Sequence, residues 1–170
     1  MLIDHPSIER VLAVIEANGT GYMVSRREKG DDLGSLLARE NVLDEQQILA
    51  LLTPLLDGLD QVHRERLMHA DIRPERILIR PDGTPVLTGF ASARWQLAQV
   101  PGCPIVLQPS NYAPVEQFSP LGEKTLRPTR DIYALAATLY QAVTGLVPPD
   151  AIARGGVLLG QPDPLPRYTR

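Results

Sequence analysis

Residues Met68–Arg94 read MHADIRPERILIRPDGTPVLTGFASAR and form the most informative stretch of the chain. An H-x-D triplet at 69–71 is followed closely by a basic residue and a proline. Two short apolar runs come next, at Ile77–Arg80 and Val86–Thr88, and Pro81-Asp82-Gly83 between them predicts a turn. We therefore expect a polar loop that leads into a short hairpin.

This order of residues resembles the catalytic core of a protein kinase. Members of that family carry a catalytic loop H-R-D-x-K-P-x-N, a short hairpin and then the triplet D-F-G. In this chain His69-Ala70-Asp71 corresponds to H-R-D, and Arg73-Pro74 corresponds to K-P. Arg76 takes the place of the asparagine, and Gly89-Phe90-Ala91 takes the place of D-F-G. The resemblance is therefore to a degenerate kinase, of the kind called a pseudokinase.

Three further segments resemble kinase motifs, in the order that the family uses. Asp4–Ile8 is similar to the H-P-N-I turn, and residues 112–117 (YAPVEQ) are similar to the end of the activation segment in bacterial serine/threonine kinases. Asp131–Leu135 resembles the start of the buried helix that anchors the catalytic loop. The eighteen residues from Asp71 to Gly89 also match the family spacing.

Small-molecule phosphotransferases are the alternative within the same superfamily. They share the H-x-D loop and a downstream Asp before an apolar pair. They lack a Y-A-P-x-E-Q segment followed by a D-I-Y-A-L helix, and this chain has both. The protein kinase resemblance is therefore favoured.

The fold class expected from these patterns is α+β: a partial protein-kinase-like fold with a mostly helical C-terminal lobe. Apolar runs at Ile8–Ile15 and Thr20–Ser25, separated by Ala17-Asn18-Gly19, predict a hairpin that would be a remnant of the N-terminal lobe. Periodicity and capping residues predict helices at Leu33–Arg39, Asp44–Arg66 and Asp131–Val143. Pro54 is expected to kink the second of them.

We expect three regions along the chain. Residues 1–32 would hold the remnant strands and the hinge, 33–150 the core of the C-terminal lobe, and 151–170 a tail rich in Pro and Gly. A cluster of prolines from Pro101 to Pro128 predicts a long irregular loop. The Gly-rich loop, the strand lysine and the last helices of the family have no counterpart here, so the chain is expected to cover the middle of a kinase domain.

The resemblance assigns roles to the residues of the loop. Asp71 is the candidate catalytic base, and Arg73 stands in place of the family lysine. Gly89 and Arg76 stand at the two magnesium-ligand positions, where one offers no side chain and the other a cation. No metal and no other cofactor are therefore expected.

The role of Arg76 is left open between three alternatives. Its guanidinium could pair with Asp71 and hold the loop without an ion, or it could reach a nucleotide phosphate. It could also be a solvent-facing residue that was tolerated once catalysis had been lost. Arg73 has a similar choice between Asp71, a phosphate and the activation segment.

Four residues have structural roles by the same resemblance. His69 is expected to be buried beneath Phe90, and Asp131 to accept hydrogen bonds from the backbone of the catalytic loop. Glu116 would pair with an arginine of C-terminal helices that have no counterpart here. His69 and Phe90 are thus expected to belong to the core, and Asp131 and Glu116 to hold the structure through their polar contacts.

The remaining positions of interest lie near the hinge or are isolated histidines. Ser25 aligns with the gatekeeper, and Arg26 to Glu28 align with the hinge that would contact a nucleotide. His5 and His63 have no Cys, His or carboxylate at ligand spacing, so we expect ordinary residues of a turn and of a helix surface.

Composition narrows the class of protein. The chain has 170 residues, 44% hydrophobic and 22% charged, with a net charge of −3, so one globular domain is expected and nucleic acid is not an expected partner. Cys103 is the single cysteine, which excludes an intramolecular disulfide. No apolar run reaches membrane-spanning length, and no signal peptide is visible, so a cytoplasmic location is expected.

Three hypotheses on function follow. The first is a catalytically inactive kinase-like domain that acts as a binding or regulatory module with a protein partner in signalling. The second is an active serine/threonine kinase that uses ATP and magnesium, with the rest of its domain supplied elsewhere. The third is a decayed kinase fragment with exposed apolar faces.

Overall fold

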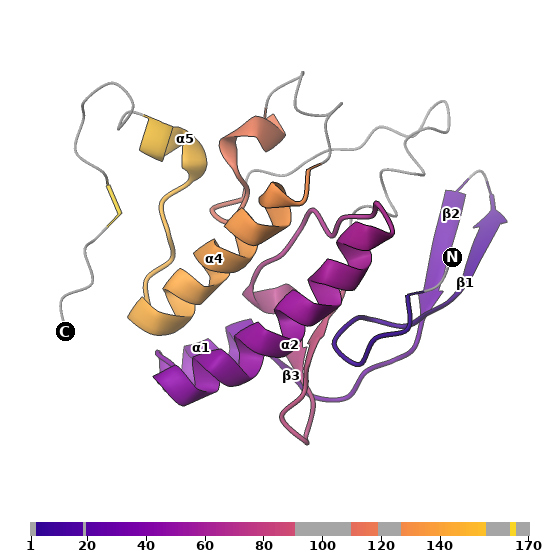
Figure 1. The fold of residues 1–170 in the computed structure, drawn as a ribbon, viewed down its shortest axis with the longest axis horizontal. Coiled ribbons are helices and arrows are strands. Elements are labelled where there is room, and N and C mark those ends of the chain that lie inside the picture. The colour runs from indigo at the N-terminus through magenta and orange to yellow at the C-terminus, as the bar shows by residue number, and fades with distance from the viewer. Residues whose placement is uncertain (1–2, 19, 91–109, 119–126, 156–163, 166–170) are drawn as a thin grey trace.

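The computed structural model describes residues 3–18, 20–90, 110–118, 127–155 and 164–165 (Figure 1). Its strands are β1 (Val11–Ala17), β2 (Thr20–Ser25), β3 (Asp31–Asp32), β4 (Ile77–Ile79) and β5 (Pro85–Leu87). Its α-helices are α1 (Leu33–Glu40), α2 (Glu45–Arg64), α4 (Thr129–Thr144) and α5 (Ala151–Arg154), and two 3-10 helices are η1 (Pro74–Arg76) and η2 (Val115–Phe118). Ala91, most of the predicted loop Pro101–Pro128 and most of the predicted tail lie outside the described residues.

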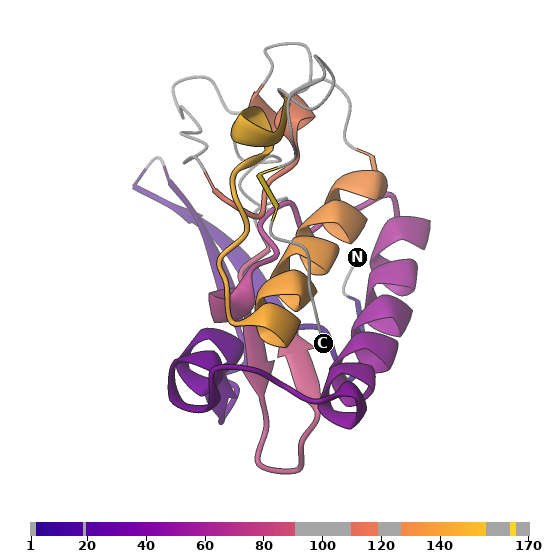
Figure 2. The same ribbon diagram turned by 90° about the vertical axis from the view of Figure 1, so that its left-hand side faces the viewer.

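The elements form a helical body with a small hairpin at one side. Helices α2 and α4 lie side by side in both views (Figures 1 and 2). Strands β3, β4 and β5 form one antiparallel sheet, and β1 and β2 form a separate antiparallel pair. This arrangement confirms the predicted α+β fold with a mostly helical body and a remnant hairpin. The division of the chain at residues 32 and 150 stays a prediction.

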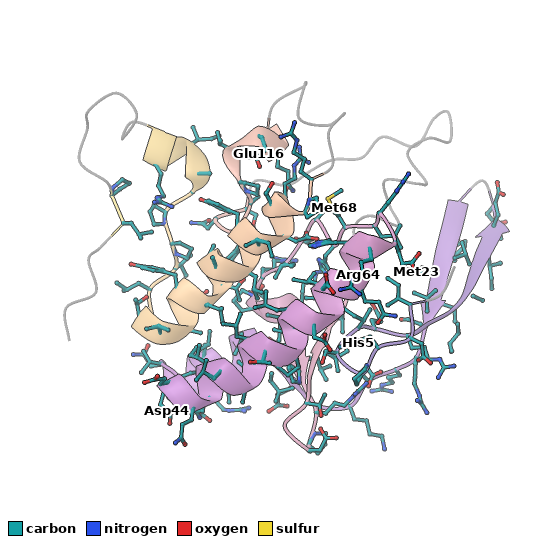
Figure 3. The ribbon with its side chains drawn as sticks, viewed as in Figure 1. His5, Met23, Asp44, Arg64, Met68 and Glu116 are labelled. Atoms are coloured by element: carbon teal, nitrogen blue, oxygen red, sulfur yellow. The ribbon has the colours of Figure 1, made fainter. Side chains whose placement is uncertain are left out.

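Helix α2 begins where the sequence predicts it. The Asp44 side chain accepts a hydrogen bond from the Gln47 N–H, and the Gln47 side chain accepts one from the Asp44 N–H, each at 2.8 Å (Figure 3). This capping box satisfies two donors that the first turn leaves without helical partners. The helix then continues through Pro54 as far as Arg64. None of the helices in the described part of the chain has the length and apolarity needed to cross a bilayer.

The hydrophobic core lies between the helices and the β3-β4-β5 sheet. Helix α2 contributes its periodic apolar face, and α4 contributes small and branched side chains. The core members from these two helices are Leu51, Leu55, Leu59, Val62, Ala134, Leu135 and Ala142. The core also surrounds polar groups, because His69, Asp131 and Thr138 have no exposed surface. Buried polar side chains of this kind need hydrogen-bond partners, and their bonds organise the loop described below.

The predicted strand Ile8–Ile15 begins three residues later than expected. Ile8 is buried beside β5, where the Leu87 N–H donates to the Ser7 carbonyl and the Glu9 N–H donates to the Leu87 carbonyl. Ile8 and the turn before it also pack closely on α2, since a Cβ on Gly58 would lie 2.9 Å from Ile8 Cδ1 and 3.0 Å from His5 Nδ1. The segment Ser7–Glu9 therefore belongs to the body of the domain, and only the residues after it form the hairpin.

Candidate functional site

The loop between α2 and β4 is held by one buried carboxylate. Asp131 Oδ2 accepts hydrogen bonds from the His69 N–H at 2.9 Å and from His63 Nε2 at 2.8 Å, and its Oδ1 accepts one from the Ala70 N–H at 2.8 Å. Ala70 has a positive φ of 63°, which turns the chain toward Asp71. The carboxylate of α4 thus fixes a strained turn in the loop from beneath.

Two opposing effects act on the pKa of Asp131. Burial on its own raises the pKa, because the charged form loses its hydration. The hydrogen bonds from His63 and from the two backbone N–H groups lower it, and the net result is a pKa below the ordinary value. The carboxylate is therefore ionised near neutral pH. His63 was expected to be an ordinary helix-surface residue, and this expectation was wrong, because its side chain reaches Asp131.

His69 is a fully buried structural residue. Its Nδ1 accepts the Asp71 N–H at 3.2 Å, so Nε2 carries the ring proton and donates to the Thr88 carbonyl at 2.9 Å. The Phe90 ring lies 4.5 Å from the imidazole, centroid to centroid. Burial lowers the pKa of His69, which favours the neutral ring that both hydrogen bonds need. The structure therefore places His69 against Phe90, in the arrangement that the family resemblance implied.

Asp71 faces two guanidinium groups. Arg76 donates from Nε to Asp71 Oδ2 at 3.0 Å, and its Nη2 lies 2.9 Å from the same oxygen. The other oxygen, Oδ1, lies 3.4 Å from Arg73 Nε, which is an ion pair without hydrogen-bond geometry. Of the three alternatives for Arg76, the structure shows the first, in which its guanidinium pairs with Asp71.

Gly89 lies directly against the same arginine. A Cβ at this position would lie 2.7 Å from Arg76 Nη1 and 3.0 Å from its Cδ and Cζ. Gly89 also has a φ of 75°, in the left-handed region that side chains rarely adopt. The guanidinium therefore fills the space that the first atom of an aspartate side chain would need. The two residues that depart from the family pattern, Gly89 and Arg76, therefore fit together sterically, because a glycine leaves room for the arginine.

Glu9 is a residue of this site that the sequence analysis did not identify. Its carboxylate accepts the Gly89 N–H at 2.7 Å and the Ser25 hydroxyl at 2.5 Å. It thus links the gatekeeper position to the position of the D-F-G aspartate. The sequence feature that could have pointed to Glu9 is that it is an acidic residue within the apolar run Ile8–Ile15. In the part of the chain that the structure describes, no three His, Cys, Asp or Glu side chains converge on a point where a metal ion would fit.

The hinge is tied to the body by an arginine. Arg80 Nε donates to Glu28 Oε2 at 2.8 Å, and its Nη1 donates to the Pro6 carbonyl at 2.9 Å. The hydrogen bond from Arg80 lowers the pKa of Glu28. The Arg26 N–H donates to the Arg10 carbonyl and so continues the hairpin. Glu28 was assigned to the hinge as a nucleotide contact, and in the structure its side chain is directed to Arg80.

We predict that Arg80→Ala loosens the hinge and lowers the free energy of unfolding by about 1 kcal/mol, since the pair is only partly shielded from water. Amide hydrogen exchange should rise at the hinge residues around Glu28. Arg39→Ala, which removes an exposed ion pair with Asp31, is the matched control and should leave exchange at the hinge unchanged. Equal exchange in the two variants would contradict the role given to Arg80.

The end of the activation segment is fixed to α4, but Glu116 is not. The Tyr112 hydroxyl donates to Gln141 of α4, and burial, followed by the charge of Glu75, raises the pKa of Tyr112 to about 12. Glu116 lies in η2 with its side chain exposed (Figure 3). None of the ion pairs among the described residues includes it. The arginine partner implied by the resemblance is therefore not found within the described part of the chain.

Comparison with known proteins agrees with this geometry. A family model described as the protein kinase domain matches residues 1–155. The chain belongs to the protein kinase domain family. The resemblance drawn from the loop, the YAPVEQ segment at residues 112–117 and the start of α4 is thereby confirmed.

The relatives include bacterial serine/threonine kinases. The chain is 32% identical over 148 residues to the serine/threonine-protein kinase PknA of Nostoc sp., covering 83% of this chain and 26% of that protein. It is 30% identical to PknL of Mycobacterium tuberculosis, covering 75% of this chain and 31% of that one. A solved structure of the apo form of PpkA-294 matches with a TM-score of 0.70 and 36% identity, over 90% of this chain and 53% of the other. The chain thus spans less than a third of the curated relatives named here.

Proposed function

We propose that this kinase domain does not transfer phosphoryl groups and acts as a binding or regulatory module. The observation that supports the proposal is the position of Arg76, which is bonded to Asp71 and lies against Gly89. A protein partner and a role in signalling are part of the proposal. The cytoplasmic location stays a prediction.

Phosphoryl transfer depends on positioning and on neutralising the charge of the phosphates. Magnesium does this when hard oxygen ligands hold it in octahedral geometry. In this chain neither ligand position offers a side-chain oxygen, and the permanently charged guanidinium of Arg76 lies against Gly89. Arg76 supplies a positive charge here, but its Nε and Nη2 groups are directed to Asp71.

The same pair also limits the access of a substrate to Asp71. A catalytic carboxylate must be able to approach the hydroxyl proton of its substrate at hydrogen-bond distance. Here one oxygen of Asp71 is shared by two nitrogens of Arg76, and the other faces Arg73. The charges of the loop are therefore paired within the protein, between Asp71 and the two arginines. We propose no cofactor for this loop.

One observation favours the alternative of an active serine/threonine kinase using ATP and magnesium. Asp71 is present at the position of the catalytic base, and the bacterial relatives are named as serine/threonine-protein kinases. Activity would require Arg76 to leave Asp71 before a metal could enter. The third hypothesis, a decayed fragment, differs in predicting no cooperative unfolding of the purified chain.

We predict that magnesium and ATP together do not raise the melting temperature of the chain by more than about 1 °C, because bound ligand stabilises the folded state by mass action only when a site exists. Differential scanning fluorimetry with ATP and MgCl2, with ATP and EDTA, and with MgCl2 alone measures this. A cooperative transition without a magnesium-dependent shift is the expected result.

A magnesium-dependent shift of several degrees would contradict the proposal, and a non-cooperative transition would favour the decayed fragment. Phosphoryl transfer gives a direct test with labelled ATP and generic protein substrates. Transfer by the wild-type chain that is lost in Asp71→Ala would overturn the proposal and establish the active alternative. No incorporation with either protein is the expected result.

A further inference from the structure

Glu9 lies at the base of the β1–β2 hairpin, directly after the buried Ile8 and just before β1 begins. Its side chain is half-buried, and both of its carboxylate oxygens are used: Oε1 accepts the Ser25 hydroxyl and Oε2 accepts the Gly89 N–H. Hydrogen bonds to an ionised acceptor are roughly twice as strong as those between neutral groups. One side chain thus joins the end of β2 to the residue that stands at a metal-ligand position.

The Glu9 side chain takes the place of a backbone acceptor. The segment before the hairpin pairs in parallel with β5, because the Leu87 N–H donates to the Ser7 carbonyl and the Leu87 carbonyl accepts the Glu9 N–H. In a regular parallel ladder the next bond would run from the Gly89 N–H to the Glu9 carbonyl. Here the Glu9 carboxylate accepts that N–H instead, so the ladder ends and Gly89 adopts its φ of 75°.

The conformation of Gly89 determines the space that is left for Arg76. The Arg76 guanidinium fills the position of a Cβ on Gly89, which would lie 2.7 Å from Nη1. The backbone of Arg76 is held separately, since its carbonyl accepts both the N–H and the hydroxyl of Thr88, at 2.8 and 3.2 Å. A change in the Gly89 backbone would therefore act on the side chain of Arg76, and through it on Asp71.

We propose that Glu9 is a clamp that couples the β1–β2 hairpin to the pair of Arg76 and Asp71. While its carboxylate holds both Ser25 and Gly89, Gly89 keeps its left-handed conformation and Arg76 stays on Asp71. A movement of β2 that breaks the bond to Ser25 loosens the carboxylate, releases the Gly89 N–H and thereby frees Arg76. The inference rests on the proposed function and deepens it, because it names the contact that keeps the charges of the loop paired.

Solvent exchange of the Arg76 Nε–H, measured by NMR on the full chain, tests the clamp. This proton is bonded to Asp71, and its signal is assigned by its absence from the spectrum of Arg76→Lys. Glu9→Met keeps the length of the side chain but removes both acceptors, so exchange at Arg76 should become about five-fold faster. Glu16→Met, which removes an exposed carboxylate of β1, is the matched control and should leave the rate unchanged.

A backbone amide reports on general stability in the same samples. The Leu43 N–H donates to the Ala142 carbonyl, and Leu43 is buried in the core. A general loss of stability would speed exchange at Leu43 as well, whereas the clamp predicts a change at Arg76 without one at Leu43. Ser25→Ala is a milder change on the hairpin side, and it should raise the rate at Arg76 about two-fold.

The inference is overturned by an equal rise at Arg76 and Leu43 in Glu9→Met, or by an Arg76 rate that stays at the wild-type value in Glu9→Met or in Ser25→Ala. These failures are separate from failure of the proposed function. Phosphoryl transfer by the wild-type chain would refute the proposed function and leave the coupling of Glu9 to Arg76 standing. Unchanged exchange at Arg76, in a chain that transfers no phosphoryl group, would refute only the clamp.

Discussion

Asp131→Ala is expected to lower the free energy of unfolding by about 1–3 kcal/mol, the cost of leaving buried hydrogen-bond donors without an acceptor. The substitution leaves the N–H groups of His69 and Ala70 without an acceptor inside the domain, and His63 loses its carboxylate. Chemical denaturation monitored by circular dichroism measures the loss. Asp57→Ala removes a more exposed partner of a histidine and is the matched control, with a much smaller expected effect.

The same residue predicts how stability depends on pH. Because the folded-state pKa of Asp131 lies below its ordinary value of 3.8, its contribution is fully present above about that pH and is lost as the pH falls through the lower folded value. Asp131→Asn should therefore flatten the acid side of the stability profile. If Asp131→Ala and Asp57→Ala cost the same, or if Asp131→Asn keeps the wild-type profile, Asp131 does not anchor the loop.

Much of the loop could be predicted because its geometry is set by nearby residues. The H-x-D triplet, the proline after it and the turn at Pro81–Gly83 are short-range signals, and they give the loop and hairpin that the structure shows. The capping box at Asp44 is equally local. Asp131 is distant in sequence, but its place at the start of an apolar helix resembled a known motif closely enough to predict its hydrogen bonds.

The side chains that were missed have partners far away in the chain. Glu9 bonds a residue 80 positions later, His63 one that is 68 later and Glu28 one that is 52 later. No periodicity or local spacing encodes such pairs, because they depend on how the elements pack. The late start of β1 has the same origin, since Ile8 is drawn into the core beside β5.

The contact between Arg76 and Gly89 could not be predicted from the sequence. The sequence indicates only that both metal-ligand positions are changed, and it gives no sign that the two residues touch each other. The structure shows one guanidinium that bonds Asp71 and fills the space beside Gly89. The two substitutions are therefore expected to be energetically coupled, which a double-mutant cycle can measure.

We predict that Gly89→Asp alone destabilises the domain by about 2–3 kcal/mol, from the left-handed backbone and the displaced guanidinium. Adding Arg76→Asn should recover at least about 1 kcal/mol, since the clash disappears. The double variant then holds an aspartate, an asparagine and Asp71 around one point, and magnesium should bind there. Isothermal titration calorimetry with MgCl2 and ATP measures binding, and denaturation measures the coupling.

Catalysis should not return with the metal. None of the 170 residues corresponds to the Gly-rich loop or the strand lysine of the family, so the phosphates would have a metal but no group to orient them from above. A misplacement of about 1 Å can already cost about 100-fold in rate. We therefore expect magnesium binding by the double variant without phosphorylation of generic substrates. Additive effects of the two substitutions on stability would show that Arg76 does not depend on Gly89. Transfer by the double variant alone would leave the wild-type domain inactive, and it would show that this chain needs less of the missing region to orient a nucleotide than its family relationship implies.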